Sequence, residues 1–338
     1  MKIIKTARSQ LGINMVEIMI AMLIGVFLVG GLIQMFIGSK KTYSLQEANA
    51  RLQENGRFAI EFLSQDVHQA DFWGCITDNT KVYPFGAGSV GVSGNDNDDS
   101  DADVVNGTDS ITLTGFKNLA IPVVETGSNT TPLTIQAGTG DSLDVNDWAV
   151  VTNCEYADVF RVLGNSGTSI DHDDFANEYG TSAQILKWYS VTYDIRLGSN
   201  GQPALFKSQF DPNNVLVVGS RQELVEGIED MQILYGEDSD DDGIADRYLP
   251  INQVDDTANI KGVRITLLAG SATRGLISTK EGITLIYASG SGVEGPESNS
   301  KAVTTCPSNS TSSTCMGMTD GRVRNVYDIT LAIRNRLK

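Results

Sequence analysis

The segment that most constrains this chain is an apolar run close to its start. Residues 18–37 are twenty residues in which Gln34 is the only strongly polar side chain, and they are long enough to cross the hydrocarbon core of a membrane as a helix. The preceding residues 1–12 are short and basic, so the positive-inside rule places them on the cytoplasmic side. An ordinary secretory signal has a shorter apolar core and a small-residue cleavage site behind it, whereas this run leads into the polar residues 38–42. The segment therefore predicts a single membrane anchor with the rest of the chain outside the cytoplasm.

A carboxylate stands at the entrance of this apolar helix. Glu17 lies four residues beyond Ile13 and five beyond Gly12, and a charge at that depth is costly unless it has a partner or a function. The order of glycine, apolar residue and spaced glutamate, here G-INMVE, resembles the processing site of type IV prepilins. The resemblance implies that an inner-membrane prepilin peptidase cuts between Gly12 and Ile13, that Ile13 is N-methylated, and that Glu17 pairs with the terminal amine of a neighbouring subunit. The alternative is an ordinary single-pass anchor in which Gly12 and Glu17 occur by chance.

The apolar helix continues into an amphipathic one. After residue 41 apolar side chains recur at intervals of three, four or seven, which marks one face of a helix; they are Leu45, Ala48, Leu52, Ala59, Phe62, Leu63, Val67 and Ala70. We therefore predict a helix over residues 13–72, in which 13–37 lie in the membrane or a filament core and 38–72 pack on a globular head. Major pilins commonly have a proline where this chain has Gln34. The nearby Gly30–Gly31 pair either loosens the helix or permits close helix packing.

The charge of the chain excludes one class of partner. It carries 25 basic and 42 acidic residues, a net charge of −17. Residues 1–12 hold three of the basic ones, so the mature chain would carry 22 basic and 42 acidic groups, a net −20. Direct nucleic-acid binding needs a basic footprint, so we do not expect it, whereas a polyanion suits cation binding. The GxSxG, P-loop, HExxH and strand-borne GxGxxG motifs are absent from the sequence, and we do not expect an enzyme.

The remainder of the chain has the pattern of β-structure with long loops. Apolar and polar residues alternate, as in half-buried strands, at 109–116, 188–196, 262–269 and 323–333. Polar segments rich in Gly, Ser, Asp and Asn separate them at 86–108, 164–182 and 290–321. The last of these segments would connect the final two strands as a long hairpin connection. We predict one membrane-distal head over residues 73–338 and an α+β fold.

Four further segments narrow the resemblance. Residues 51–75 closely resemble the helix end and following cysteine of PilW-type minor pilins, and blocks at 152–162, 223–236 and 327–336 follow in the family's order. The resemblance implies a pilin-like fold, with a long N-terminal helix packed on an antiparallel β-sheet head. It implies a minor pilin that helps initiate type IV pilus assembly at or near the tip, in contact with other minor pilins, the major pilin and a tip adhesin. The head would face the periplasm from the inner membrane before assembly and lie on the pilus at the cell surface afterwards.

Three alternatives stay open. A J-type pseudopilin of type II secretion shares the leader and a segment like 223–236, although the length, the cysteines and the C-terminal block favour PilW. A surface adhesin or carbohydrate-binding head on a pilin stalk would use the loops at 86–108 and 290–321 as its contact surface. A membrane-anchored enzyme would need convergent catalytic side chains in the head. The sequence does not show whether the pilus serves motility, adhesion or DNA uptake.

The four cysteines suit an exported protein, because an even number is typical of disulfide bonding in an oxidising compartment. Cys306 and Cys315 close a short loop in a Ser/Thr-rich segment, which leaves Cys75 and Cys154 for each other. The PilW resemblance also places Cys75 and Cys154 at the positions that the family uses for a disulfide. The alternative is four reduced thiols in a cytosolic protein.

An acidic loop at residues 238–246, DSDDDGIAD, has the order of a calcium loop. Alternating carboxylates converge on one ion, a glycine makes the sharp turn, and the next residue offers its carbonyl. The candidate ligands for Ca²⁺ are Asp238, Asp240, Asp242, the carbonyl of Ile244, and Asp246. Leu249 stands where an EF-hand has its bidentate glutamate, so we expect modest affinity; the alternative is a solvated acidic turn.

Two other polar segments are weaker candidates. The acidic stretch 95–103 has no glycine at the turn position and is expected to be a plain loop. His172 lies in the acidic run 171–174, but one histidine among solvated carboxylates is a weak indication of a metal site. His68 falls on the amphipathic helix and is expected at the surface or in packing.

Overall fold

The structure is a computed structural model. It describes residues 14–76, 81–83, 91–97, 101, 103–125, 130–140, 143–275, 284–285, 304–305 and 321–336. The predicted leader, the cleavage residues Gly12 and Ile13, and both Cys306 and Cys315 lie outside these residues.

One helix, α1 (Met15–Gln69), dominates the N-terminal part. Its 55 residues give a length of about 80 Å at 1.5 Å per residue. It begins after Asn14, whose side chain accepts a hydrogen bond from the first turn and caps it. It ends because Ala70 takes extended backbone angles and Asp71 has φ 58°, outside the right-handed helical region. The helix is continuous, as expected over 13–72, and ends three residues earlier.

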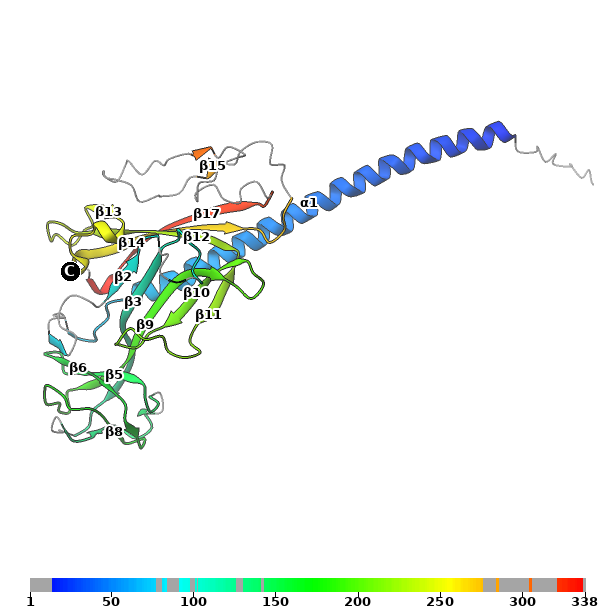
Figure 1. Cartoon of the computed structure of the whole chain (residues 1–338). Coiled ribbons are helices and arrows are strands. Elements are labelled where there is room, and N and C mark those ends of the chain that lie inside the picture. The colour runs from blue at the N-terminus through cyan, green and yellow to red at the C-terminus, as the bar shows by residue number, and fades with distance from the viewer. Residues whose placement is uncertain are drawn as a thin grey trace, which may run out of the picture.

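The two halves of α1 have opposite surroundings. The first half projects away from the strands (Figure 1), and its large apolar side chains from Met15 to Ile37 are exposed. The second half places one face in the head; its buried residues are Ala48, Leu52, Gly56, Ala59, Leu63, Asp66 and Val67. The buried residues recur at the three- and four-residue spacing of one helical face, so only this half is held by tertiary packing.

The larger sheet has eight strands, centred on the long strand β9 (Gln184–Leu197). The path order is β1-β6-β5-β9-β10-β11, and β3 also pairs with β9 and carries β2. All neighbours are antiparallel except β1 and β6. The other strands are β1 (Val82–Tyr83), β2 (Val92–Asn95), β3 (Ser110–Pro122), β5 (Trp148–Thr152), β6 (Ala157–Arg161), β10 (Pro203–Gln209) and β11 (Gln222–Glu226).

The second sheet has four antiparallel strands in the order β13-β12-β14-β17. They are β12 (Ile228–Glu237), β13 (Arg247–Leu249), β14 (Ile260–Gly270) and β17 (Arg324–Ala332). The pairing of β14 with β17 confirms that the final two predicted strands are neighbours joined by a long connection. Within that connection the structure describes a short pair, β15 (Thr284–Leu285) and β16 (Thr304–Thr305).

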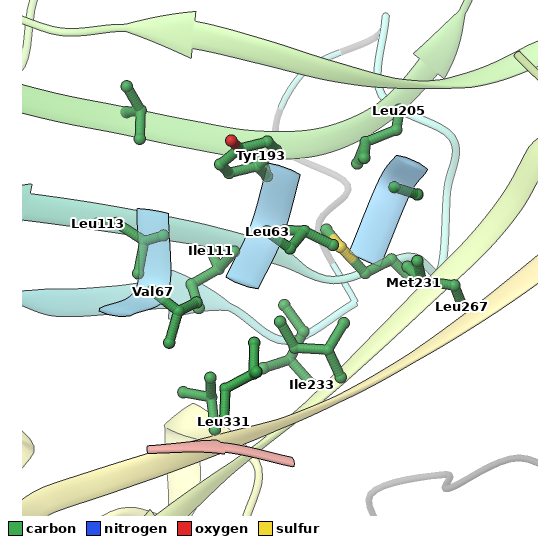
Figure 2. Packing of buried hydrophobic residues seen from close by; sticks show 14 of the residues in the cluster. Leu63, Val67, Ile111, Leu113, Tyr193, Leu205, Met231, Ile233, Leu267 and Leu331 are labelled. Carbon is green, nitrogen blue, oxygen red and sulfur yellow. The ribbon is translucent and has the colours of Figure 1, made fainter. Parts of the chain in front are cut away.

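A single hydrophobic core joins α1 to both sheets. Figure 2 shows Leu63 and Val67 of the helix among residues of the larger sheet, such as Ile111 and Tyr193, and of the smaller sheet, such as Ile233. Each fully buried aliphatic side chain stabilises the fold by about 1.5–3 kcal/mol relative to exposure. The helix therefore acts as a shared structural element between the two sheets.

A smaller core lies beside β5 and β6, away from the helix (Figure 1). A three-stranded sheet covers it, formed by β4 (Leu133–Thr134), β7 (Gly164–Asn165) and β8 (Ser169–Asp171). The segment 164–182, predicted as a polar connection between strands, thus carries β7 and β8 and buries Ile170, Phe175 and Tyr179. Three short 3-10 helices complete the described residues: η3 (Ile251–Gln253), η4 (Thr257–Asn259) and η6 (Arg334–Arg336).

Candidate functional site: the helix, its anchors and an acidic loop

The exposed half of α1 is the first functional element. Among the described residues, α1 is the one helix long and apolar enough to span a membrane. Its most apolar 18-residue window has a mean hydropathy of 2.5, and none of that window is buried. Glu17 lies in the first turn and is exposed. An exposed apolar cylinder of this size needs lipid or other helices around it.

The C-terminal end of α1 is tied down covalently. Cys75 and Cys154 form a disulfide with 4.8 Å between their Cα atoms, across 79 residues of sequence. Cys154 follows β5 directly, so the bond joins the segment after the helix to the β5–β6 turn. A covalent link over so long a loop restricts the unfolded chain and stabilises the fold in a way that depends on loop length.

The C-terminal segment holds the same end of the helix by polar contacts. The Arg336 guanidinium donates to the Asp71 carboxylate at 2.5 Å, and the Asn335 side chain donates to the Ala70 carbonyl at 2.8 Å. Both acceptors lie just beyond the last helical turn, where carbonyls otherwise lack partners. His68 joins this contact, since its Nδ1 lies 3.0 Å from the Ala332 carbonyl. His68 is thus a packing residue, as expected.

A glycine lets β17 approach the middle of the head half of α1. The Tyr327 ring lies against Gly56, where an added Cβ would come within 2.3 Å of the ring. The Tyr327 hydroxyl donates to the Leu52 carbonyl at 2.8 Å. Gly56 is therefore required by close packing, which the sequence pattern alone did not indicate.

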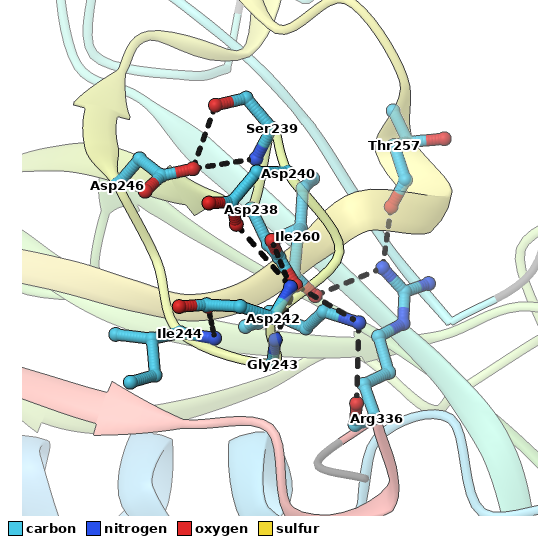
Figure 3. Close-up of polar contacts among 11 residues, drawn as sticks. Asp238, Ser239, Asp240, Asp242, Gly243, Ile244, Asp246, Thr257, Ile260 and Arg336 are labelled. Carbon is cyan, nitrogen blue, oxygen red and sulfur yellow. Dashed lines mark hydrogen bonds and ion pairs between the residues drawn. The ribbon is translucent and has the colours of Figure 1, made fainter.

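The acidic loop connects β12 to β13. Asp238 is buried, with its side chain fully covered, whereas Asp240 and Asp246 are exposed. One carboxylate oxygen from each of these three residues lies within 4.8 Å of the others. Figure 3 shows the three side chains with the loop residues around them. Three oxygens at that separation match a cation with oxygen ligands at 2.3–2.6 Å.

The backbone of the loop folds around Asp238. The N–H groups of Asp242 and Gly243 donate to its two carboxylate oxygens at 3.2 and 2.9 Å. Gly243 has φ 91°, a conformation that glycine adopts without strain. The predicted turn glycine is therefore in the place and conformation that a calcium loop requires.

One of the four predicted carboxylate ligands lies outside the converging group. The Asp242 carboxylate caps the Ile244 N–H at 2.8 Å, and Asp242 does not belong to the group of three converging carboxylates. The structure thus brings together the carboxylates of Asp238, Asp240 and Asp246 and leaves that of Asp242 with a local turn contact. The Ile244 carbonyl stays a predicted ligand. The sequence pattern did not indicate one neighbour of the loop. The Lys261 ammonium of β14 lies 3.6 Å from the Asp238 carboxylate.

The electrostatics of the loop favour a cation. Burial opposes ionisation of Asp238, but N–H donors, led by Gly243, and the Lys261 charge outweigh it and lower its pKa. The Asp242 N–H lowers the pKa of Asp240, yet the charges of Asp242, Asp246 and Asp238 together raise it overall. Bonds from the Ser239 hydroxyl and N–H lower the pKa of Asp246. Mutual repulsion of this kind is relieved by a bound cation.

The His172 segment is built for packing. Its ring stacks on Phe175 with centroids 3.7 Å apart, and its two ring nitrogens lie 2.6 and 2.9 Å from the carbonyls of Asp173 and Thr131. Both nitrogens are therefore occupied by backbone oxygens. These contacts favour the structural interpretation of this histidine over a metal ligand.

The comparisons with known proteins identify the second half of the head. Residues 192–335 match the model of the PilW family, described as type IV pilus-assembly protein W. This part of the chain is therefore similar to PilW proteins. The matched PilW range includes the C-terminal end of β9 from residue 192, all of β10 to β14 and β17, and the acidic loop. A solved type IV-like pilin from Thermus thermophilus also matches, with a TM-score of 0.37 and 10% identity over 85% of this chain and 98% of that chain. No curated protein matches the chain.

Proposed function

We propose that this PilW-family chain is a minor pilin of a type IV pilus, which helps initiate assembly and forms part of a tip complex. The observation that carries the proposal is the combination of one continuous helix with a family-specific head. The first half of α1 is apolar and exposed, and the second half is locked into the β-structure that matches PilW. A subunit of this form can leave a membrane and enter a filament without refolding its head.

The proposed mechanism is transfer of the apolar half of α1 from lipid to a bundle of neighbouring helices. Residues 13–37 provide the apolar surface, and Glu17 lies at its start. Moved into an apolar filament core, an unpaired carboxylate is costly, so the favoured registers are those that bring a positive terminal amine to Glu17. Methylated Ile13 would supply that amine after cleavage at Gly12. In this mechanism Glu17 sets subunit register and the apolar residues supply the binding free energy.

The proposed location and partners follow from this mechanism. The head faces the periplasm while α1 spans the inner membrane, and it reaches the cell surface with the pilus. Its partners are the prepilin peptidase, other minor pilins, the major pilin and a tip adhesin. The Cys75–Cys154 disulfide supports an oxidising compartment for the head, and Cys306 with Cys315 is proposed as a second bond there.

The test of this function uses the N-terminus and Glu17 in pilus-producing cells. Mass spectrometry should find N-methylated Ile13 as the first residue, and Glu17→Ala should leave processing intact while surface pili fall several-fold. Glu47→Ala is the matched control, because Glu47 lies on the same helix and pairs only at the surface with Arg51 at 2.8 Å. An intact Met1, or normal piliation in Glu17→Ala, contradicts the proposal.

We also propose that the 238–246 loop binds Ca²⁺ through Asp238, Asp240 and Asp246. Calorimetry on the full chain in detergent micelles should give a Ca²⁺ binding signal that Asp240→Asn with Asp246→Asn abolishes. The Asp242→Asn variant should retain it, because that carboxylate caps Ile244 instead. Absence of a signal in the unmodified chain, or its loss in Asp242→Asn alone, counts against this ligand set.

A further inference from the structure

Three lysines gather on one face of the larger sheet beside α1. Lys117 of β3 and Lys187 of β9 lie directly opposite each other in the strand register, and Lys207 of β10 reaches the same area. The Lys117 and Lys207 ammonium groups lie 4.8 and 5.5 Å from the centroid of the Tyr189 ring. The buried Tyr189 ring therefore has an ammonium group on each of two neighbouring strands. We name Lys117, Lys187, Lys207 and Tyr189 the lysine patch.

Such a cluster is unexpected in this chain. Acidic residues outnumber basic ones by 42 to 25, and like charges directly opposite each other on neighbouring strands are destabilising. Partial burial lowers the pKa of Lys117, and the Lys207 charge lowers it further. The arrangement costs folding free energy, so a benefit outside the isolated fold is expected.

The three lysines are not equally neutralised. Lys207 pairs with buried Asp66 of α1 at 2.6 Å, and Lys187 pairs with Asp147 at 2.5 Å. For Lys117, which is exposed, no carboxylate in the described part of the chain lies within ion-pair distance. Among the described residues, the lysine patch thus presents one exposed lysine without a carboxylate partner, beside two lysines that are paired with Asp66 and Asp147.

The neighbouring surface of α1 is aromatic. Phe62 lies one helical turn before Asp66, and Phe58 lies one turn earlier; both are 37% exposed although they lie in the head half of the helix. Exposed aromatic side chains are enriched at protein interfaces. The combined surface suits a segment that carries carboxylates and some apolar contact.

The distance of the lysine patch from the membrane indicates which negatively charged partner can reach it. Asp66 lies 29 residues beyond Ile37, the end of the apolar run, which is about 43 Å along the helix at 1.5 Å per residue. Lipid phosphates at the surface of the membrane that α1 spans are therefore out of reach of the lysine patch. A neighbouring subunit in the assembly is within reach.

We infer that the lysine patch and the adjoining Phe58 and Phe62 form a docking surface for a carboxylate-rich segment of a different pilin subunit. The inference rests on the proposed pilin function. Lys117 supplies a charge that no carboxylate of the described residues pairs, and the helix phenyl groups supply apolar contact. The contact fixes which side of this head faces its neighbour.

The experiment is photo-crosslinking of the full chain in pilus-producing cells, with p-benzoylphenylalanine in place of Phe62. We expect an adduct with an acidic segment of another pilin subunit, and a yield lowered about fivefold or more by Lys117→Glu. Arg161→Glu is the matched control, since Arg161 is an exposed basic residue of β6, a strand that does not pair with β3 or β10. It should leave the yield unchanged. Replacing an acidic residue of the crosslinked segment by lysine should restore the adduct in Lys117→Glu.

Three kinds of result overturn the inference. The first is an adduct with the wrong target, which means a second copy of this chain, a protein other than a pilin or a segment without acidic residues. The second is an adduct whose yield does not change in Lys117→Glu, and the third is no adduct from a correctly disulfide-bonded chain. Methylation of Ile13 measured in the same cells separates the two proposals. Failure of docking with a processed N-terminus rejects only the docking surface, whereas an unprocessed N-terminus rejects the pilin function first.

Discussion

The two halves of α1 form one continuous helix but have different surroundings. From Met15 to Ile37 nearly every side chain is apolar and exposed, whereas from Ala48 to Val67 one face is buried between two sheets. The first half has no tertiary partner within the described residues, so its conformation depends on local hydrogen bonds and on lipid or other helices. The second half is specified by packing against strands that are distant in sequence. Identical substitutions in the two halves should therefore have different effects.

The largest difference is expected for leucine. Leu63→Ala removes a fully buried side chain from the shared core and should lower the free energy of unfolding of the head by about 3 kcal/mol. Leu28→Ala, at a position 61% exposed, should leave it unchanged. All three tryptophans lie in the head, so tryptophan fluorescence during denaturant unfolding in micelles measures this value. Equal effects at the two positions would show that the helix halves are not independent.

A smaller difference is expected for glycine. Gly56→Ala forces the Tyr327 ring away and should destabilise the head by about 2 kcal/mol, although alanine favours helix by up to about 1 kcal/mol. Gly30→Ala, where an added Cβ meets nothing within 4 Å, should keep the helical gain alone. The same fluorescence measurement applies, with circular dichroism for helix content. A stabilising Gly56→Ala would contradict the observed β17 contact.

The last difference between the halves concerns pH and is confined to the head. Burial raises the pKa of Asp109 to about 7, against partial compensation by the N–H groups of Asn97 and Ile233. The ordinary value is 3.8, so between these two pH values the folded state binds a proton that the unfolded state has lost. The free energy of unfolding should therefore fall as pH rises from about 4 to about 7, by up to about 1.4 kcal/mol per pH unit from this group.

Asp109→Asn tests this dependence because asparagine does not titrate. The variant should unfold with a flatter pH profile over the same range, whereas exposed Asp173→Asn should keep the original slope. The helical signal of residues 15–37 should not change with pH in either variant. An unchanged slope in Asp109→Asn would show that other groups control the acid response.

In the acidic loop, some contacts follow from the spacing of residues in the sequence and others depend on strand pairing. The alternation of carboxylates and the position of Gly243 predicted the converging Asp238, Asp240 and Asp246, because a short loop places its own residues. Spacing also included Asp242, yet the structure uses its carboxylate to cap the Ile244 N–H. Lys261 could not be predicted, since it comes from β14 and approaches Asp238 only through the β12–β14 pairing.

The strands show a similar division. The alternating segments at 109–116, 188–196, 262–269 and 323–333 are all strands in the structure. The strands β5, β6 and β12 were not among those predicted, because they are buried on both faces over much of their length, and such strands lose the period of two. Short β7 and β8 form because a second core requires cover.

The sequence by itself determined the long helix, its division into an apolar and an amphipathic half, and the residues that we propose for processing and for cation binding. These depend on local periodicity and on the distance between neighbouring residues in the chain. Tertiary structure alone decided that α1 lies between two sheets, that Gly56 admits Tyr327, and that Lys117, Lys187 and Lys207 meet on one face. Those contacts join residues tens to hundreds of positions apart, and only strand register and core packing bring them together.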